Sequence, residues 1–166
     1  MRIFLTLVFV STFFIMTNAQ DKLKESLPLI NGKVTYINTI KLDSVSKDEI
    51  YNRAKHWLAY NSDRIMIDNN DELIGRGHFL VDFSHVWYSI TIHIKDGRYK
   101  YEITNFQVTQ NIVMNGESTE IERNIETYST FLGMGETKFY NKVNSRIIIL
   151  KDSFEKTLNT RIKDNW

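Results

Sequence analysis

The chain has 166 residues, no cysteine, and 21 basic residues against 20 acidic ones. The lack of cysteine excludes disulfide bonds and the modified cysteine of a bacterial lipoprotein. Because the two charge signs are interleaved along the chain, the sequence argues against nucleic acid as a partner and against membrane-surface binding through a basic face.

Residues 1–19 have the pattern of a secretory signal peptide. Arg2 supplies a positive charge, and residues 3–16 form an apolar run that is interrupted by Thr6, Ser11 and Thr12. We expect cleavage after Ala19, which leaves 147 of the 166 residues in an exported protein, either periplasmic or secreted. The run is too short to cross a bilayer comfortably, so we predict no membrane span, with an uncleaved anchor as the alternative.

The mature chain is expected to begin with a tether over residues 20–31, a polar segment that contains the only proline, Pro28. The fold is expected to start near Gly32. From Lys33 to Leu42 apolar and polar residues alternate, which predicts a half-buried strand.

A helix is predicted next, because Ser46 and Glu49 have the spacing of a capping box. Val45 and Ile50 have the spacing of a hydrophobic staple across it. The apolar residues that follow recur at helical spacing up to about Asn61 and predict a stripe that packs against another layer, formed by Ile50, Ala54, Trp57 and Leu58.

An antiparallel series of strands is predicted after the helix, over residues 64–68, 72–83, 86–95 and 98–108. Gly75 and Gly77 suggest a bulge or bend in the second of these strands. Asp96-Gly97 predicts a two-residue type I′ turn between the last two strands, which fixes their pairing.

That pairing divides the hairpin into two faces. One face is expected to be core and pairs Ile94 with Tyr99, Ile92 with Tyr101, and Ile90 with Ile103. The other is expected to face water and pairs His93 with Lys100, Thr91 with Glu102, Ser89 with Thr104, and Trp87 with Phe106.

The last third of the chain, residues 111–166, is predicted to be an extension of a core that spans residues 32–110. Residues 118–132 are interpreted as either a helix or a mobile arm. From Glu136 to about Thr160 apolar residues again recur at helical spacing, which predicts a long helix that packs on the core through Phe139, Val143, Ile147, Leu150, Phe154 and Leu158.

Several spaced motifs between residues 32 and 108 resemble those of a known family. They are Gly32-Lys33-Val34, Ser46-Lys47-Asp48-Glu49-Ile50-Tyr51, Arg53-Ala54, Trp57, Gly75, Gly77, Trp87-Tyr88-Ser89-Ile90 and Lys95-Asp96-Gly97-Arg98-Tyr99-Lys100-Tyr101. This set resembles the bacterial domain of unknown function 4468, which is described as having a TATA-binding-protein-like fold. The resemblance implies an α+β fold in which an antiparallel sheet carries helices on one face, in the order β-α-β-β-β-β followed by a C-terminal helix. It implies no catalytic or ligand-binding residues.

The water-facing side of the hairpin is the first candidate site. Exposed aromatic residues on a sheet are typical of contact surfaces. The candidate binding residues are Trp87, Ser89, Thr91, Glu102, Thr104 and Phe106. Three interpretations stay open: the C-terminal helix covers the aromatics, a protein or peptide partner covers them, or a small apolar ligand binds there.

A metal site is the second candidate, because His78, Asp82 and His85 form the tightest cluster of ligand-type residues. The alternative is that these are ordinary polar residues at the end of a strand. Gly75-Arg76-Gly77 lacks the spacing of a phosphate-binding loop, and no nucleophile elbow is present. We therefore predict no cofactor.

Taken together, these patterns favour a non-catalytic exported module of the cell envelope that binds or assembles with an unidentified protein, peptide or small apolar ligand. The alternative is a metal-dependent hydrolase that uses His78, Asp82 and His85.

Overall fold

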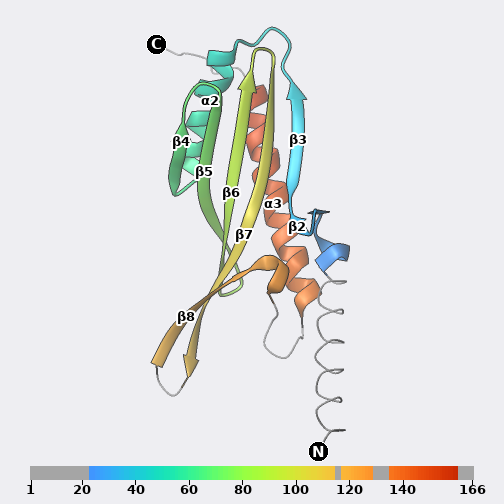
Figure 1. The fold of residues 1–166 in the computed structure, drawn as a ribbon, viewed down its shortest axis with the longest axis vertical. Helices are drawn as coiled ribbons and strands as arrows, with labels where there is room; N and C mark the ends of the chain where they lie inside the picture. The colour runs from blue at the N-terminus through green and yellow to red at the C-terminus, as the bar shows by residue number, and fades with distance from the viewer. Residues whose placement is uncertain (1–22, 115–116, 129–134, 161–166) are drawn as a thin grey trace, which may run out of the picture.

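The computed structural model describes residues 23–114, 117–128 and 135–160, and the predicted signal peptide with its cleavage site lies outside them. A six-stranded antiparallel sheet forms its centre (Figure 1). The strand order is β3-β7-β6-β5-β4, and β8 also pairs with β7. These strands are β3 (Tyr36–Lys41), β4 (Arg64–Asp68), β5 (Glu72–Val81), β6 (Ser84–Lys95), β7 (Arg98–Met114) and β8 (Glu117–Asn124).

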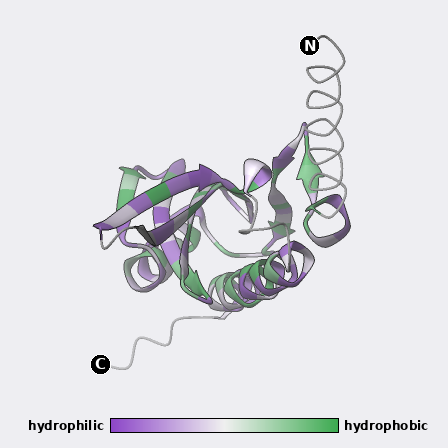
Figure 2. Ribbon diagram, turned by 90° about the horizontal axis from the view of Figure 1, so that it is seen from below, coloured by the Kyte–Doolittle hydropathy of each residue, from purple (hydrophilic) through white to green (hydrophobic). Residues whose placement is uncertain are grey.

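Two helices, α2 (Lys47–Asn61) and α3 (Glu136–Asn159), lie on the same face of this sheet. The view along the strands shows the curved sheet on one side and the helices on the other (Figure 2). This confirms the predicted α+β class with helices on one face, and the predicted element order is also found. Among the described residues, no helix is long and apolar enough to cross a membrane.

The segment expected to be a tether contributes to the fold from residue 23 onward. Leu23 and Leu27 are 2% and 3% exposed and join the core. The chain then forms a small two-stranded sheet from β1 (Leu29–Ile30) and β2 (Lys33–Val34). The burial of Leu23 and Leu27 could not be predicted from the sequence, because two leucines four residues apart are too few to define a period.

Helix α2 begins as predicted. The Ser46 hydroxyl accepts a hydrogen bond from the Glu49 backbone N–H at 3.3 Å. The Glu49 carboxylate does not complete the capping box but pairs with Arg53 one turn later. All four residues of the predicted stripe are buried.

The two glycines of β5 serve close packing rather than a bulge. A Cβ at position 75 would lie 2.7 Å from Leu58 Cδ2, and one at position 77 would lie 2.9 Å from the Asn61 carbonyl oxygen. The register of β5 with β6 is continuous, and the irregularity lies in the neighbouring β4, between Ile65 and Ile67. The glycines therefore let α2 approach the sheet.

The β6–β7 turn has the predicted position but not the predicted type. Lys95 pairs with Arg98, as expected for a two-residue loop. A type I′ turn needs positive φ at both central residues, and here only Gly97 has it, at 67°. The Asp96 carboxylate accepts a hydrogen bond from the Lys47 backbone N–H at 2.8 Å, and Gly97 bonds to the loop before α2. These contacts hold the turn in its different conformation.

The predicted pairing of β6 with β7 is confirmed from the turn as far as Ser89 and Thr104. Beyond that point it was wrong, because Trp87 pairs with Gln107 and not with Phe106. Asn105 adopts a positive φ of 56° and adds one residue to β7, which is a β-bulge. The extra residue turns Phe106 to the helix side, where it is 1% exposed.

Residues 118–132 were expected to form a helix or a mobile arm. Their described part instead forms strand β8, which pairs with β7 from Gln107 to Met114, and then the short 3₁₀ helix η1 (Ile125–Thr127). Strand β3 pairs with β7 from Arg98 to Ile103, so β3 and β8 follow one another along the same edge of β7. The β7–β8 pair projects from the body (Figure 1).

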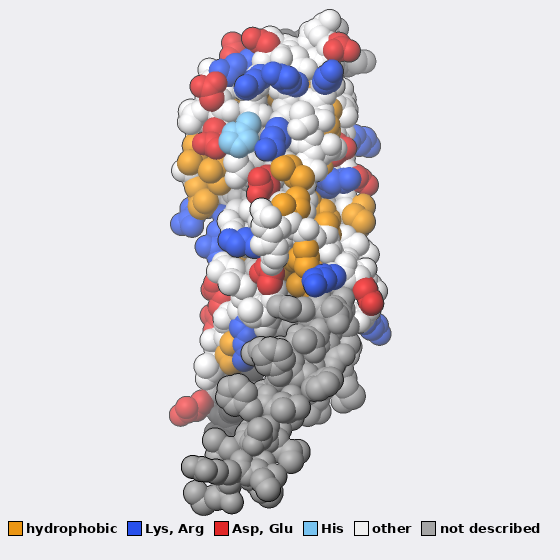
Figure 3. Space-filling view, turned by 45° about the vertical axis from the view of Figure 1, so that its right-hand side comes forward, with side chains coloured by type: hydrophobic (Ala, Val, Ile, Leu, Met, Phe, Trp, Pro, Cys, Tyr) orange, Lys and Arg blue, Asp and Glu red, His pale blue; other side chains and the backbone are white. Residues whose placement is uncertain are grey.

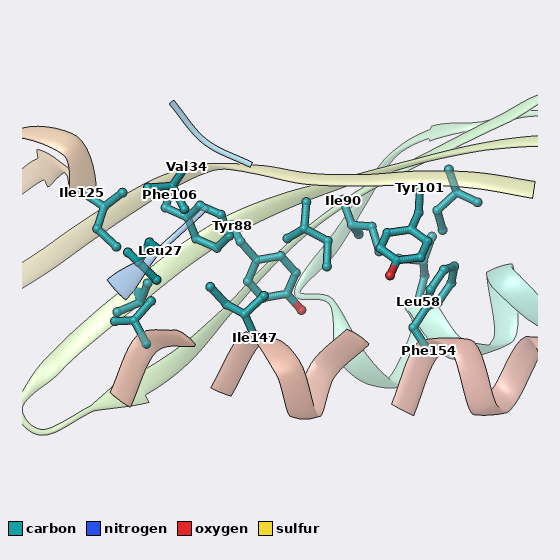
Figure 4. Packing of buried hydrophobic residues seen from close by; sticks show 14 of the residues in the cluster. Leu27, Val34, Leu58, Tyr88, Ile90, Tyr101, Phe106, Ile125, Ile147 and Phe154 are labelled. Atoms are coloured by element: carbon teal, nitrogen blue, oxygen red, sulfur yellow. The ribbon is translucent and has the colours of Figure 1, made fainter. Parts of the chain in front are cut away.

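The predicted C-terminal helix is present as α3, and its stripe faces the sheet. Phe139, Val143, Ile147, Phe154 and Leu158 are buried, while Leu150 is half-buried. Figure 4 shows Ile147 of α3 against Tyr88, and Phe154 against Tyr101. The core thus lies between the sheet and the two helices, and no helix of the described residues lies on the opposite face of the sheet.

Candidate functional site

The sheet face that points away from α2 and α3, here called the outer face, holds five of the six predicted binding residues. Strands place successive side chains on opposite faces, so the residues between the buried ones of β6 and β7 lie on this side. All five are half-buried: Trp87, Ser89, Thr91, Glu102 and Thr104. Phe106 does not belong to the site, because the bulge at Asn105 moves it into the core.

A hollow of about 330 Å³ surrounds Trp87 on the outer face. We call it the Trp87 pocket. Strands β4, β5, β6, β7 and β8 all contribute residues to it, and β3 contributes none. Its lining consists of Asp63, Arg64, Arg76, Trp87, Thr109, Glu120 and Glu122.

Arg76 is held in place at the floor of the Trp87 pocket. The centre of its guanidinium group lies 5.2 Å from the centroid of the Trp87 ring, within the range of a cation–π contact. Its Nη2 donates a hydrogen bond to Gln107 Oε1 at 2.8 Å. Among the described residues it has no carboxylate partner. Most of its five N–H donors therefore stay available to an occupant of the pocket.

Thr109 adds a buried polar group to the same floor. It is 5% exposed, and its hydroxyl oxygen has no hydrogen-bond partner within the described parts of the chain. It pairs with His85 of β6 on one side and with Glu122 of β8 on the other. A buried hydroxyl without a partner costs about 1–3 kcal/mol, so such groups are uncommon unless something satisfies them.

The wall formed by β8 is acidic. Glu120 and Glu122 are exposed, and neither has an ion pair with another described residue. On the far side of the pocket, Arg64 also lacks an ion pair within the described ranges, and its guanidinium lies 3.9 Å from the Met66 sulfur. The Trp87 pocket therefore has two arginines without an ion pair on its β4–β5 side, where the one acidic residue, Asp63, bonds to His78. Its β8 side has two glutamates without an ion pair.

The predicted metal site is only partly assembled. The rings of His78 and His85 are neighbours, with centroids 5.1 Å apart, and His78 also packs on Trp87 at 4.7 Å. Asp82 lies in the turn after β5 and pairs with Lys142 of α3. His78 Nδ1 is instead 2.8 Å from Asp63 Oδ2. Among the described residues, no group of three or more His, Cys, Asp or Glu side chains has an arrangement that holds a metal ion.

A second hollow of about 480 Å³ lies on the outer face near the β6–β7 turn. Lys and Arg side chains gather toward this end of the molecule (Figure 3). The interleaved charges along the sequence do not indicate this local excess of basic side chains. A hydrogen bond from Lys47 lowers the pKa of Asp71 at the rim. The acidic, basic and histidine residues of its lining are Asp71, His93, Lys95, Arg98 and Lys100.

Sequence reasoning found Trp87 but missed the residues that surround it. Arg76 had a usable signal, because period-two alternation places it opposite Gly75 and Gly77 and therefore away from the helices. Thr109 and the two glutamates had none, since their position depends on the pairing of β7 with β8, which was not recognised as a strand pair.

Comparisons with known proteins agree with this fold. Residues 36–109 match the model of a domain of unknown function (DUF4468) with TBP-like fold. The crystal structure of a TBP-like protein from Parabacteroides distasonis ATCC 8503 has a TM-score of 0.67 and 17% identity, over 81% of this chain and 98% of that one. The crystal structure of a DUF4468 family protein from Bacteroides ovatus ATCC 8483 has a TM-score of 0.52 and 14% identity, over 83% and 93%.

The curated proteins give no match to this chain. At identities below one fifth, the two crystal structures show the fold alone and say nothing of a ligand. The predicted resemblance is nevertheless confirmed: residues 36–109 match the DUF4468 family, and the chain has the TBP-like fold of that family.

Proposed function

We propose that the protein is a non-catalytic, exported binding or assembly module of the cell envelope and that the Trp87 pocket is its ligand site. The observation that carries this proposal is the pocket itself. An aromatic ring, a guanidinium without a carboxylate partner and a buried hydroxyl without a hydrogen-bond partner converge there. Concave sites with a few convergent polar groups are the usual form of small-molecule binding sites.

Binding is favoured over catalysis by the way these groups are used. Arg76 is fixed by Trp87 and Gln107, which suits recognition because little side-chain entropy is lost when an occupant binds. The hydrolase alternative requires His78, Asp82 and His85 to share one metal ion. Since Asp82 pairs with Lys142, that alternative has no support from the arrangement of these side chains.

Export is inferred from the sequence of residues 1–19. The test is the intact mass of the protein recovered from the periplasm and medium of an expressing bacterium. A mature chain that begins at Gln20 supports the proposal. Full-length protein that stays in the cytoplasm contradicts it.

Ligand binding is tested with an NMR screen of the mature protein against small anions, cations, zwitterions, neutral sugars and short peptides. We expect a hit that shifts the indole N–H signal of Trp87. In Trp87→Ala, where binding is followed through the signals of the ligand instead, the hit is expected to be lost. Tyr60→Ala is the matched control, because Tyr60 is an aromatic residue that is 78% exposed and lies on α2, away from the outer face. Hits that persist in Trp87→Ala, or a screen in which no compound shifts the Trp87 signal, would contradict the proposal.

A further inference from the structure

The Trp87 pocket separates its charges by strand. Arg64 and Arg76 come from β4 and β5, whereas Glu120 and Glu122 come from β8. Asp63, directly before β4, also lines the pocket, but its carboxylate bonds to His78 at 2.8 Å, so the β4–β5 side keeps an excess of positive charge. Strands β6 and β7 lie between β5 and β8 in the sheet. With neighbouring strands about 4.8 Å apart, the backbones of β5 and β8 are separated by roughly 14 Å, and that of β4 lies one strand further from β8. The long side chains reduce these distances.

Neither the two arginines nor the two glutamates form an ion pair within the described parts of the chain. Arg76 bonds only to the Gln107 amide oxygen, and no ion pair involves Glu120 or Glu122. The two sets of opposite charges line one hollow but do not pair with each other. They are therefore complementary to a molecule that carries one charge at each end. The Trp87 ring between them offers an apolar surface to the middle of such a molecule.

From this arrangement we propose that the Trp87 pocket binds a small zwitterion whose carboxylate and ammonium groups are separated by several bonds, such as a short peptide with free ends. The carboxylate lies against Arg76 and Arg64, where a guanidinium offers paired N–H donors in the geometry of a carboxylate. The ammonium lies against Glu120 and Glu122. This inference rests on the proposed function, since it names the ligand class of the same pocket.

The size of the hollow agrees with this ligand class. A volume of about 330 Å³ lies at the lower end of the range for small-molecule sites, about 300–1,000 Å³. The charge separation also sets a minimum length, because a ligand that contacts both walls must extend across β6 and β7. Glycine, whose two charged groups are adjacent, is therefore expected to bind poorly.

The experiment titrates the mature protein with straight-chain ω-amino acids, from glycine to aminohexanoic acid, and follows the indole N–H signal of Trp87 by NMR. We expect affinity to rise with chain length. The N-acetyl and methyl ester forms of aminohexanoic acid, each of which lacks one charge, are expected to bind at least about tenfold more weakly, because a hydrogen bond to a charged group contributes about 1.5–3 kcal/mol.

Two variants assign the ends of the ligand. Arg76→Gln is expected to remove the preference for the free acid over the ester, and Glu122→Gln the preference for the free amine over the N-acetyl form. Glu102→Gln is the matched control, because Glu102 lies on the same face but does not line the pocket. Preferences that survive in both pocket variants overturn the assignment.

Two further outcomes separate this inference from the proposed function. The Trp87 signal could shift only with N-acetyl-aminohexanoic acid methyl ester, which lacks both charges, or with compounds of the wider screen but not with zwitterions. Either result overturns the ligand class and leaves the pocket as a binding site. The absence of any shift with every compound overturns both. Equal affinity for glycine and aminohexanoic acid overturns the inferred charge separation.

Discussion

At the scale of single residues, close packing of α2 on β5 depends on two positions without a side chain. The two glycines differ in what surrounds them. A Cβ at Gly75 would meet the mobile end of Leu58, whereas one at Gly77 would meet the backbone carbonyl of Asn61 and the ring of Tyr88. A side-chain end can move aside, but the end of a helix cannot do so without losing packing.

Gly77→Ala is therefore expected to lower the free energy of unfolding by about 1–3 kcal/mol, the usual cost of overpacking. Gly75→Ala is expected to cost less, because Leu58 can change rotamer. Urea denaturation of the two variants beside the parent measures the difference. A larger loss of stability in Gly75→Ala than in Gly77→Ala would contradict this, because it would mean that the end of α2 moves more easily than the Leu58 side chain.

Asn105 is a second residue on which the architecture depends, because its positive φ creates the bulge that turns Phe106 inward. Asn105→Gly is expected to be nearly neutral, since glycine adopts this conformation without strain. Asn105→Val is expected to cost about 1–2 kcal/mol. Unfolding curves for the two variants test this, and equal stabilities would mean that the bulge is not required.

At the scale of elements, α3 is held on the sheet by a row of large side chains. Phe154 contacts Trp57, Tyr99 and Tyr101, with ring centroids 4.9–5.6 Å apart. Hydrogen bonds add to this contact on both sides of Phe154 along the helix: Tyr36 donates to Asn144, and the buried Arg53 donates to the Leu158 carbonyl. The helix is therefore part of the core.

Phe154→Ala is expected to destabilise the protein by about 3–5 kcal/mol, because it removes a fully buried ring and leaves a cavity. Ile149→Ala on the same helix serves as the control. Ile149 is 62% exposed, so its loss is expected to change stability by no more than about 0.5 kcal/mol. Thermal or urea unfolding measures both, and similar losses in the two variants would contradict the packing of α3.

Elements with a strong period could be predicted from sequence, and those that depend on pairing could not. The stripes of α2 and α3 and the register next to Gly97 were visible because each is encoded within about twenty residues. The bulge was hidden, since Asn105 is only one of many residues that tolerate positive φ. Strand β8 has few apolar residues to reveal a period. The Trp87 pocket depends on both the bulge and β8, so it could not be predicted.

At the scale of the whole molecule, burial of tyrosine is a recurring feature. Burial raises the pKa of six of the eight tyrosines above the ordinary value: Tyr36, Tyr88, Tyr99, Tyr101, Tyr128 and Tyr140. In the unfolded chain these phenols lose their protons near pH 10, whereas the folded protein keeps them protonated. Since the folded state then binds more protons, stability falls as the pH rises.

We expect the free energy of unfolding to be unaffected by these tyrosines below about pH 10 and to decrease steeply above it. Tyrosinate absorbance and circular dichroism, followed together during an alkaline titration, provide the test. Most of the absorbance change is expected to coincide with the loss of secondary structure. Full tyrosine ionisation in a protein that keeps its circular dichroism spectrum would contradict the burial of these rings.

Within the part of the chain that the structure describes, one face of the sheet has no helix, and the residues that carry the proposed function lie there. The helix side is occupied by large apolar side chains, whereas the outer face combines Trp87 with charged and polar residues. The two hollows on this face differ in charge. The one near the β6–β7 turn is mainly basic, and the Trp87 pocket carries both signs.

Amide chemical-shift changes, mapped over the whole mature chain during titration with aminohexanoic acid, test the role of the Trp87 pocket most directly. The predicted result is a set of changes centred on Arg76, Trp87, Thr109 and Glu122. The second hollow, around Lys95 and Lys100, should remain unchanged. Changes centred on that second hollow or on the outer surfaces of α2 and α3, or no changes at all, would contradict a binding site for zwitterions at Trp87.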